Sequence, residues 1–363
     1  MLEDSTRHVA PAPGTQHPAP STRFAVSAPV NRQVILKSRP SGIPQAEHFE
    51  IVERRVPDAG PGQLLVRNIY LSVDPAMRGW ISAVANYSQP VGIGEVMRAY
   101  AAGRIEASRD SRFREGEYVT GQFGWQDYAA VDPPMVIRRV ADRDLPLSTA
   151  LGVLGMNGLT AYFGLLEVGQ PKPGETVVVS TAAGAVGSCV GQIARIRSCR
   201  AVGIAGGAEK RRLCLEEFHY DAAVDYKAGR LDADLAQAAP NGVDVYFDNT
   251  SGATSDAVLA RLNVGARVVV CGTASIDSWD PWPQGPRVER HLLVKRARMQ
   301  GILVFDFRAR YPEAIEELTR WVRNGSIRYR EEIVDGIEQA PGSIASLYRG
   351  ENLGRRLIRI APL

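Results

Sequence analysis

The chain has 363 residues, of which 45% are hydrophobic and 23% charged, so it is long enough for two globular domains with full cores. Its 43 lysines and arginines nearly balance its 40 aspartates and glutamates, and a net charge of +3 excludes the concentrated basic face of a nucleic-acid-binding protein. The four cysteines have no paired spacing, which argues against a disulfide scaffold and predicts a reducing, cytoplasmic compartment.

The first part of the chain is predicted to be an extension followed by a β domain. Residues 1–28 are rich in alanine, proline, serine and threonine and lack the apolar core of a signal peptide, so we expect a disordered extension. From residue 29 to about 150, short apolar runs alternate with turn residues, as on either side of the proline- and glycine-rich segment 57–62. This rhythm predicts a compact barrel or sandwich of short strands.

The uncharged stretch between Asp144 and Glu167 needs separate treatment, because it is nominally long enough to cross a bilayer. It contains four glycines and several polar residues, where a spanning helix would be dominated by leucine, isoleucine, valine and phenylalanine. We therefore predict a buried helix beside a site, and no membrane segment.

Residues 151–326 change to a rhythm of strand, turn and helix. Strands are expected at 177–179, 201–204, 243–248, 267–271 and 301–305, and helices from the glycine turn to about 198 and at 209–218, 253–262 and 312–323. Continuous valine and isoleucine runs are typical of strands buried on both faces, so this half is predicted to be a doubly wound parallel sheet. The segment 327–363 ends in a strand at 356–360 and is expected to return to the first domain.

A glycine-rich turn follows the first of these strands. Gly184, Ala185, Val186 and Gly187 lie in an Ala-x-Gly-x-x-Gly pattern between a β-branched strand and an apolar helix pattern. Gly184 would let the backbone approach a pyrophosphate, Gly187 would let helix and strand pack closely, and the helix N-terminus would hold the phosphates. The alternative is a packing turn only, but the further strand–helix units favour a dinucleotide site.

The end of the next strand distinguishes NADPH from NAD. Sites for NAD usually carry an acidic residue about 20 residues beyond the glycines, to hold the ribose 2′-hydroxyl. Here residues 203–207 contain no carboxylate, and Lys210, Arg211 and Arg212 follow. A 2′-phosphate attracts such cations, so NADPH is favoured. The alternative is that the three cations form a solvated helix face.

No other chemistry stands out. A zinc dehydrogenase needs cysteine, histidine and carboxylate ligands, yet no cysteine lies in the β domain and no Cys-x-x-Cys occurs. His8 and His17 lie in the extension, and His48, His219 and His291 are isolated. Gly-x-Ser-x-Gly is absent as well. We therefore predict a site without metal.

Several segments together resemble one family. They are the motif Leu71-Ser72-Val73-Asp74-Pro75-Ala76-Met77-Arg78-Gly79, the glycine turn, and residues 155–164, 224–227, 247–249, 271–275 and 351–354. Over about 31–360 the chain resembles the zinc-independent medium-chain dehydrogenase/reductases of the leukotriene B4 12-hydroxydehydrogenase/prostaglandin reductase type, with bacterial curcumin reductases and plant alkenal double-bond reductases. The resemblance implies a GroES-like β-barrel substrate domain (29–150 with 327–363) into which a Rossmann domain (151–326) is inserted.

The resemblance also implies roles for individual residues. Residues 184–187 would bind pyrophosphate, and Lys210 with Tyr226 the 2′-phosphate. The ribose and nicotinamide side would be contacted by Asn249 and the turn 271–277, whose members include Cys271, Gly272, Thr273, Ala274 and Ser275. Ile302, Leu303 and Val304 would line the nicotinamide, and Asn352 would reach the cofactor from the returning segment. The alternatives are packing roles for Tyr226 and Cys271 and turn roles for Asn249 and Asn352.

The chain departs from the family where a proton donor is expected. Family members often have tyrosine where this chain has Ala76, and an aromatic hydroxyl where it has Phe305 and Phe307. The candidate left is Tyr87, in a segment matching the bacterial members; the alternative is an ordinary loop tyrosine.

The predicted reaction is NADPH-dependent reduction of the carbon–carbon double bond of an enone or enal, with hydride to the β-carbon and a proton to the α-carbon. The alternatives are an NADPH:quinone oxidoreductase of the same fold and an NADPH-binding protein without turnover. The resemblance implies a homodimer. The loops 87–94 and 278–286, with Trp279 and Trp282, are expected to form pocket walls.

Overall fold

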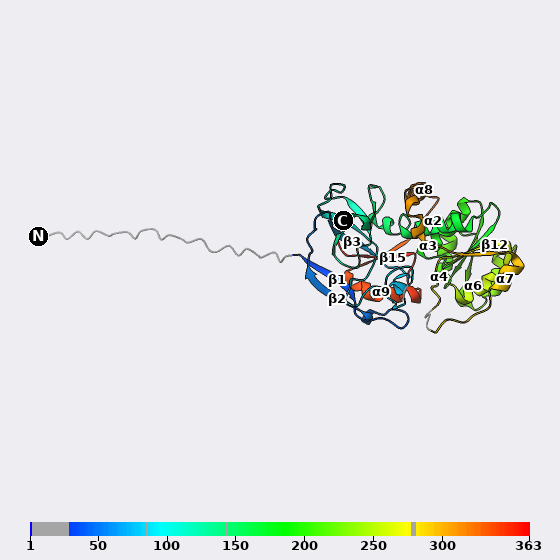
Figure 1. Ribbon diagram of the computed structural model, residues 1–363. Helices are drawn as coiled ribbons and strands as arrows, with labels where there is room; N and C mark the ends of the chain where they lie inside the picture. Colours follow the sequence, from blue (N-terminus) through cyan, green and yellow to red (C-terminus); the bar gives the residue numbers. More distant parts are fainter. Residues whose placement is uncertain (2–28, 85, 143, 277–280) are drawn as a thin grey trace.

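The computed structural model describes residue 1 and residues 29–84, 86–142, 144–276 and 281–363. The extension expected to be disordered, with His8 and His17, lies outside the described residues, as do Asp277, Ser278 and Trp279. The described chain forms two lobes, each built around one large sheet, with α2 and α8 where the lobes meet (Figure 1).

The first lobe is built from strands that pair antiparallel, except for the parallel pair β14 and β15. A seven-stranded sheet has the order β14-β15-β3-β4-β5-β7, with β6 paired to β3, and β1 and β2 form a separate pair. The strands of this lobe from the first part of the chain are β1 (Val30–Leu36), β2 (Phe49–Arg55), β3 (Leu64–Ser72), β4 (Ala101–Ser108), β5 (Tyr118–Gly121), β6 (Tyr128–Val131) and β7 (Val136–Arg139). The short helix α1 (Met77–Trp80) follows β3.

The second lobe is a six-stranded parallel sheet of order β10-β9-β8-β11-β12-β13 with helices on both faces. Its strands are β8 (Thr176–Ser180), β9 (Arg200–Ala205), β10 (Ala222–Asp225), β11 (Val243–Asp248), β12 (Leu262–Val270) and β13 (Arg298–Gly301). Its helices are α2 (Met156–Phe163), α3 (Ala185–Ile196), α4 (Ala208–Glu216), α5 (Leu231–Ala238), α6 (Gly252–Leu259), α7 (Glu289–Lys295) and α8 (Tyr311–Arg323).

Both faces of the parallel sheet are buried. In β8, Val177 and Val179 pack into the core under α2, α3 and α8, whereas Val178 packs into the opposite core under α5 and α6. Because successive side chains point to opposite faces, a strand covered on both sides needs a continuous apolar run. The predicted fold class, a Rossmann-type sheet inserted into an antiparallel β domain, is confirmed.

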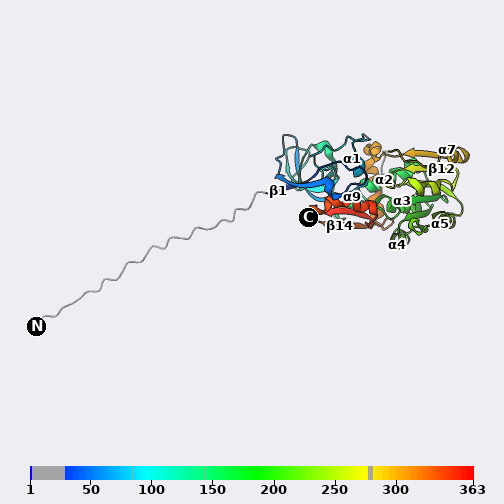
Figure 2. The same cartoon turned by 90° about the horizontal axis from the view of Figure 1, so that it is seen from below.

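The returning segment joins the two lobes. It contains β14 (Glu331–Asp335), α9 (Ala340–Arg349) and β15 (Arg355–Arg359), and β15 pairs antiparallel with β3. Figure 2 shows α9 and β14 along the lobe that carries β1. Just before β15, Gly354 forms a bridge with Gly184 of the glycine turn. The end of the chain therefore completes the first sheet and also touches the candidate cofactor site.

Two predicted elements were wrong. The stretch between Asp144 and Glu167 is not one helix: a 3₁₀ turn (Leu147–Leu151), α2 and a π turn (Gly164–Gly169) follow each other. A side chain at Gly155 would strike the carbonyl oxygen of Ala150, which shows how closely the chain folds back there. No helix among the described residues is long and apolar enough to cross a membrane.

The apolar run 301–305 was predicted to be a strand, but β13 ends at Gly301 and a 3₁₀ helix (Val304–Arg310) begins three residues later. The run lies beyond the carboxyl end of the sheet: Ile302 packs on the core, Val304 is buried and Phe305 is partly exposed. Its hydrophobicity therefore reflects packing beside the cleft between the lobes rather than pairing in the sheet.

Candidate cofactor and active site

The glycine turn connects the carboxyl end of β8 to the N-terminus of α3. A side chain at Gly187 would strike the carbonyl oxygen of Thr181 and come within 2.9 Å of the Ala182 Cα, both backbone atoms. Gly184 is the residue before the first turn of α3, and its side-chain position is also crowded by Thr181. The turn is thus as tight as a pyrophosphate cradle requires, with the free N–H groups of α3 at its rim.

Two lysines and a tyrosine gather beyond the next strand, β9. Lys227 lies over the Tyr226 ring, with its Nζ 6.0 Å from the ring centroid, and both side chains press against Gly206. Lys210 donates to the carbonyl oxygen of Gly350 at 2.7 Å. Burial, and then the positive charge of Lys227, lower the pKa of the Lys210 ammonium. Two ammonium groups that destabilise each other favour a bound anion between them.

The other two cations expected here are engaged elsewhere. Arg211 Nε donates to the carbonyl oxygen of Ala223, and Arg212 pairs with Glu216 on the exposed side of α4. Lys227 was missed by the sequence reasoning, although it directly follows Tyr226. The structure therefore brings Lys210, Tyr226 and Lys227 together as the candidate 2′-phosphate site.

Lys210→Ala is expected to raise the KM for NADPH by about 10- to 100-fold, the loss of one charge-assisted hydrogen bond, and to leave the KM for NADH nearly unchanged. Initial-rate measurements with both cofactors test this. Arg212→Ala is the matched control, because it removes an equal charge from the same helix but should leave both constants unchanged. Equal effects of Lys210→Ala on the two cofactors would contradict the assignment.

The carboxyl ends of β11 and β12 form the next part of the site. Asn249 follows β11, and its side-chain Nδ2 donates to the carbonyl oxygen of Ser180 at 2.7 Å, which ties the end of β11 to the end of β8. Cys271 follows β12 and donates its backbone N–H to Asp248 at 2.8 Å. A side chain at Gly272 would lie 2.9 Å from the Asn249 carbonyl oxygen, so the turn 271–276 packs closely on Asn249.

Cys271 is not a nucleophile in this arrangement. Burial raises the pKa of its thiol to about 12, so the sulfur is protonated at neutral pH. Cys271 is half-buried and packs at the margin of the core at the end of β12, as a small apolar side chain does.

The segment after β13 completes the wall of the parallel sheet. Ile302 continues from β13 by donating its N–H to Val270, and Val304 is buried. Phe307 stacks on Phe163 of α2 with ring centroids 4.7 Å apart. Phe305 points the other way and lies 6.3 Å, between ring centroids, from Tyr87 of the first lobe. Phe305 and Phe307, which stand where the resembled family often has an aromatic hydroxyl, therefore pack against different neighbours.

Tyr87 lies opposite this wall. Its side chain is 49% exposed, and its hydroxyl oxygen accepts a hydrogen bond from Trp80 Nε1 at 3.3 Å. Burial of the hydroxyl raises the pKa of the phenol, which therefore keeps its proton at neutral and mildly alkaline pH. Because the oxygen accepts from Trp80, its own proton is available to a substrate in the cleft.

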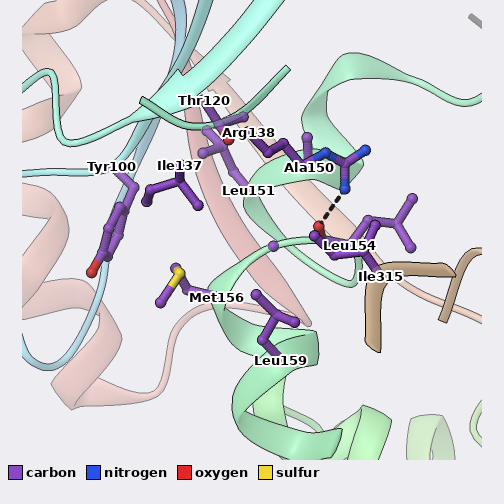
Figure 3. A pocket seen from close by; sticks show the side chains of 11 residues that line it. Tyr100, Thr120, Ile137, Arg138, Ala150, Leu151, Leu154, Met156, Leu159 and Ile315 are labelled. Atoms are coloured by element: carbon purple, nitrogen blue, oxygen red, sulfur yellow. Dashed lines mark hydrogen bonds between the residues drawn. The ribbon is translucent and has the colours of Figure 1, made fainter. Parts of the chain in front are cut away.

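A narrower pocket lies deeper between the lobes (Figure 3). It is lined by Tyr100, Met156, Leu159 and Ile315 among others, and Arg138 closes one side by donating to the carbonyl oxygen of Leu154. Its free volume of about 10 Å³ is that of one water molecule. As it stands it is therefore too small for an organic substrate.

The returning segment brings Asn352 into this neighbourhood. The bridge between Gly184 and Gly354 fixes the backbone two residues beyond Asn352 beside the glycine turn. The Asn352 side chain donates to the carbonyl oxygen of Gly354 at 2.7 Å and leaves its own oxygen for another donor. Asn352, Gly184 and Lys210 thus border one region, although they come from distant parts of the sequence.

These residues fit a phosphorylated dinucleotide. In the sheet, β9 and β10 lie on one side of β8, and β11 to β13 lie on the other. The turn between β8 and α3 is therefore at the point where the strand order reverses, which is the usual dinucleotide crevice of this architecture. Lys210 and Lys227 lie at one end of that crevice, and the wall formed by Cys271 and Ile302 lies at the other. Among the described residues, no group of three or more histidine, cysteine or acidic side chains is arranged to hold a metal ion.

Comparisons with known proteins agree with this geometry. Residues 32–138 match the family described as the N-terminal domain of oxidoreductase, and residues 185–320 match the family described as zinc-binding dehydrogenase. The NADPH-dependent curcumin reductase of Escherichia coli (strain K12) is 43% identical over 91% of this chain and 97% of that protein. The NADP(+)-dependent 2-alkenal reductase of Nicotiana tabacum is 37% identical over 91% of this chain and 98% of that protein.

A solved structure is similar over nearly the whole chain. CurA from Vibrio vulnificus in complex with NADPH superposes with a TM-score of 0.87 at 42% identity, covering 92% of this chain and 100% of that one.

Proposed function

Because the chain belongs to the medium-chain dehydrogenase/reductase family that includes these curcumin and alkenal reductases, we propose that it reduces the carbon–carbon double bond of α,β-unsaturated ketones and aldehydes with NADPH. The observation that supports the proposal is the geometry of three features: the tight glycine turn before α3, Lys210 and Lys227 beyond β9, and the Tyr87 hydroxyl that accepts from Trp80. The relatives named above supply the reaction class.

The chain's own residues would bind the substrate and stabilise the negative charge that develops on its carbonyl oxygen. NADPH, when bound, supplies the hydride that adds to the substrate β-carbon. The Tyr87 hydroxyl would donate to the substrate carbonyl oxygen, where negative charge develops, and the α-carbon then takes a proton. The rings of Tyr87 and Phe305 would orient the flat conjugated substrate between the lobes. No metal is needed, because the phenol polarises the carbonyl.

We also propose which residues contact each part of the cofactor. We assign pyrophosphate to residues 184–187, the 2′-phosphate to Lys210 and Tyr226 with Lys227, and the ribose and nicotinamide side to Asn249 and residues 271–275. Residues 302–304 would line the nicotinamide, and Asn352 would approach it from the returning segment. The domain limits at 150/151 and 326/327 are part of the same proposal. The core of the first lobe includes Leu151, and the core of the second includes Val153 and Ile327, so the change of core falls within two residues of the first limit and after Ile327 at the second.

A substrate panel tests the proposed reaction. An enone, an enal and a quinone are each mixed with enzyme and NADPH or NADH, nicotinamide absorbance is followed, and the saturated product is identified. We expect rapid NADPH consumption with the enone and enal, no loss of rate with a chelator, and a clear preference over NADH. A faster quinone reaction would favour the quinone reductase alternative, and NADPH binding without turnover would indicate a non-catalytic protein.

We also propose a homodimer in a reducing, cytoplasmic compartment. The edge strand β13 ends the parallel sheet, and the neighbouring helix α7 exposes Leu293 (79%) and Val294. An open strand edge beside exposed apolar side chains is suited to pairing with a second copy. Light scattering should give twice the chain mass, and Leu293→Glu should lower it. The four cysteines carry free thiols, which supports the compartment.

A further inference from the structure

The loop that carries Tyr87 is held by an arginine outside the family motifs. Arg98 donates from Nη1 to Ser88 Oγ at 3.2 Å and from Nη2 to the Gln89 carbonyl oxygen at 2.8 Å. These two acceptors directly follow Tyr87 in the chain. The planar guanidinium therefore fixes the backbone next to the phenol with two hydrogen bonds of defined direction.

The same arginine also packs on the hydrogen-bond partner of Tyr87. The Arg98 guanidinium carbon lies 5.9 Å from the centroid of the Trp80 ring, within the range of a cation–π contact. Trp80 is buried at the end of α1 and is held edge-on by Tyr100, with ring centroids 6.1 Å apart. Its indole N–H is the donor to the Tyr87 oxygen. Arg98 thus acts on Tyr87 by two routes, through the loop and through the indole.

We propose that Arg98 is a positioning residue that, with Trp80, orients the Tyr87 hydroxyl toward the substrate; the proposal rests on the reductase function above. The indole holds the phenol oxygen and the loop holds the backbone beside it, so the hydroxyl keeps a fixed place and its own proton is left for a substrate oxygen.

Arg39 offers a matched comparison. It clamps the two ends of the same loop by donating from Nη1 to the Ile81 carbonyl oxygen and from Nη2 to the Val91 carbonyl oxygen, at 2.7 and 2.8 Å. A third, longer hydrogen bond runs from its Nη1 to the Ser82 carbonyl oxygen at 3.4 Å, so Arg39 makes one hydrogen bond more to the loop than Arg98. It makes none to Ser88 or Gln89, and no ring contact with Trp80 is seen among the described residues. General stiffening of the loop would make the two arginines equivalent, whereas positioning of Tyr87 requires Arg98.

The test is a double-mutant cycle on the full-length enzyme with an enone that the wild type turns over. Arg98→Gln should lower kcat about tenfold, as expected for a misplaced hydrogen-bond donor to the developing oxyanion, and leave the KM for NADPH within twofold. In a Tyr87→Phe background the same change should cost less than twofold. Trp80→Phe, which keeps a ring but removes the N–H, should resemble Arg98→Gln, and Arg98→Lys, which keeps the charge, should fall between it and the wild type.

A second readout needs neither cofactor nor substrate. The emission of Trp80, taken as the difference between each protein and its Trp80→Phe counterpart, should shift to the red in Arg98→Gln and stay unchanged in Arg39→Gln. If Arg98→Gln does not fold, Arg98→Lys and Trp80→Phe provide the cycle.

The outcomes separate the two proposals. An unchanged kcat in Arg98→Gln, an equal loss in the Tyr87→Phe background, or the same coupling for Arg39→Gln would overturn the positioning role. A wild-type enzyme that turns over no enone would instead refute the proposed function, while the Trp80 emission would still report whether Arg98 organises the loop.

Discussion

Gly187→Val is expected to weaken NADPH binding by at least about 100-fold and to lower the thermal midpoint of unfolding. The new side chain would strike backbone atoms of Thr181 and Ala182, which cannot rotate away, so the start of α3 must move off the end of β8. Overpacking of this kind costs about 1–3 kcal/mol or more. It also displaces the N–H groups assigned to the pyrophosphate. Fluorescence titration with NADPH and thermal unfolding measure the two effects.

Gly342→Ala is the control for this change. Gly342 lies in α9, where an added methyl group meets no atom within 4 Å, so alanine should be neutral or slightly stabilising. A Gly187→Val protein that binds NADPH as tightly as the wild type would show that the turn between β8 and α3 is not the cofactor cradle.

The second large effect is expected from Arg355→Met. Arg355 is buried in β15 and donates from Nη1 to Asp74 Oδ1 at 2.7 Å and to the Val73 carbonyl oxygen at 2.8 Å, while its Nε donates to Leu151 at 3.1 Å. Asp74 is buried too and would keep only the hydroxyl of Ser72 as a partner. Breaking a buried pair on one side costs about 3–5 kcal/mol, and denaturant unfolding should show a loss of this size.

Two further variants test whether the lost stability of Arg355→Met comes from the unpaired Asp74. Arg359→Met lies on the same strand, but its pair with Asp335 is exposed, so only a small change is expected. Replacing both members, as in Arg355→Met with Asp74→Leu, should recover most of the stability, because no lone charge is left in the core. If the double variant is no more stable than Arg355→Met, the loss comes from the carbonyl contacts of Arg355 and not from the unpaired Asp74.

The architecture could be predicted because its signals are local. Apolar runs such as 177–179 and the glycine turn after them read directly as a buried strand and the start of a helix. A local signal also explains the wrong prediction of a strand at 301–305. The composition of this run suits a strand, but a strand needs a neighbour in register, and β12 pairs only as far as Gly301. Side chains that cover a cleft can be as apolar as those inside a sheet.

The candidate site was predictable only where a motif contains the residue. Lys210 and Tyr226 stand in recognisable segments, and Lys227 was missed although it ends the segment 224–227. Trp80 and Arg98 matter because of neighbours that folding brings to them. Arg98 lies between two apolar stretches and carries no sequence signal for a contact with an indole. Such pairs depend on how the loop 81–91 folds back, which no local pattern records.

The pairing of β15 with β3 has a consequence for how this protein is made. Strands β8 to β13 leave the ribosome consecutively, so the parallel sheet has all its members before β15 is translated. Strand β3 emerges early and pairs with β6 along residues 64–67, but on the same side its residues 70–72 lack a partner until β15 follows. During that interval this short stretch of edge is open to pairing with other chains. A nascent chain that stalls before β15 would therefore expose an unpaired edge in the lobe whose strands were mostly translated first.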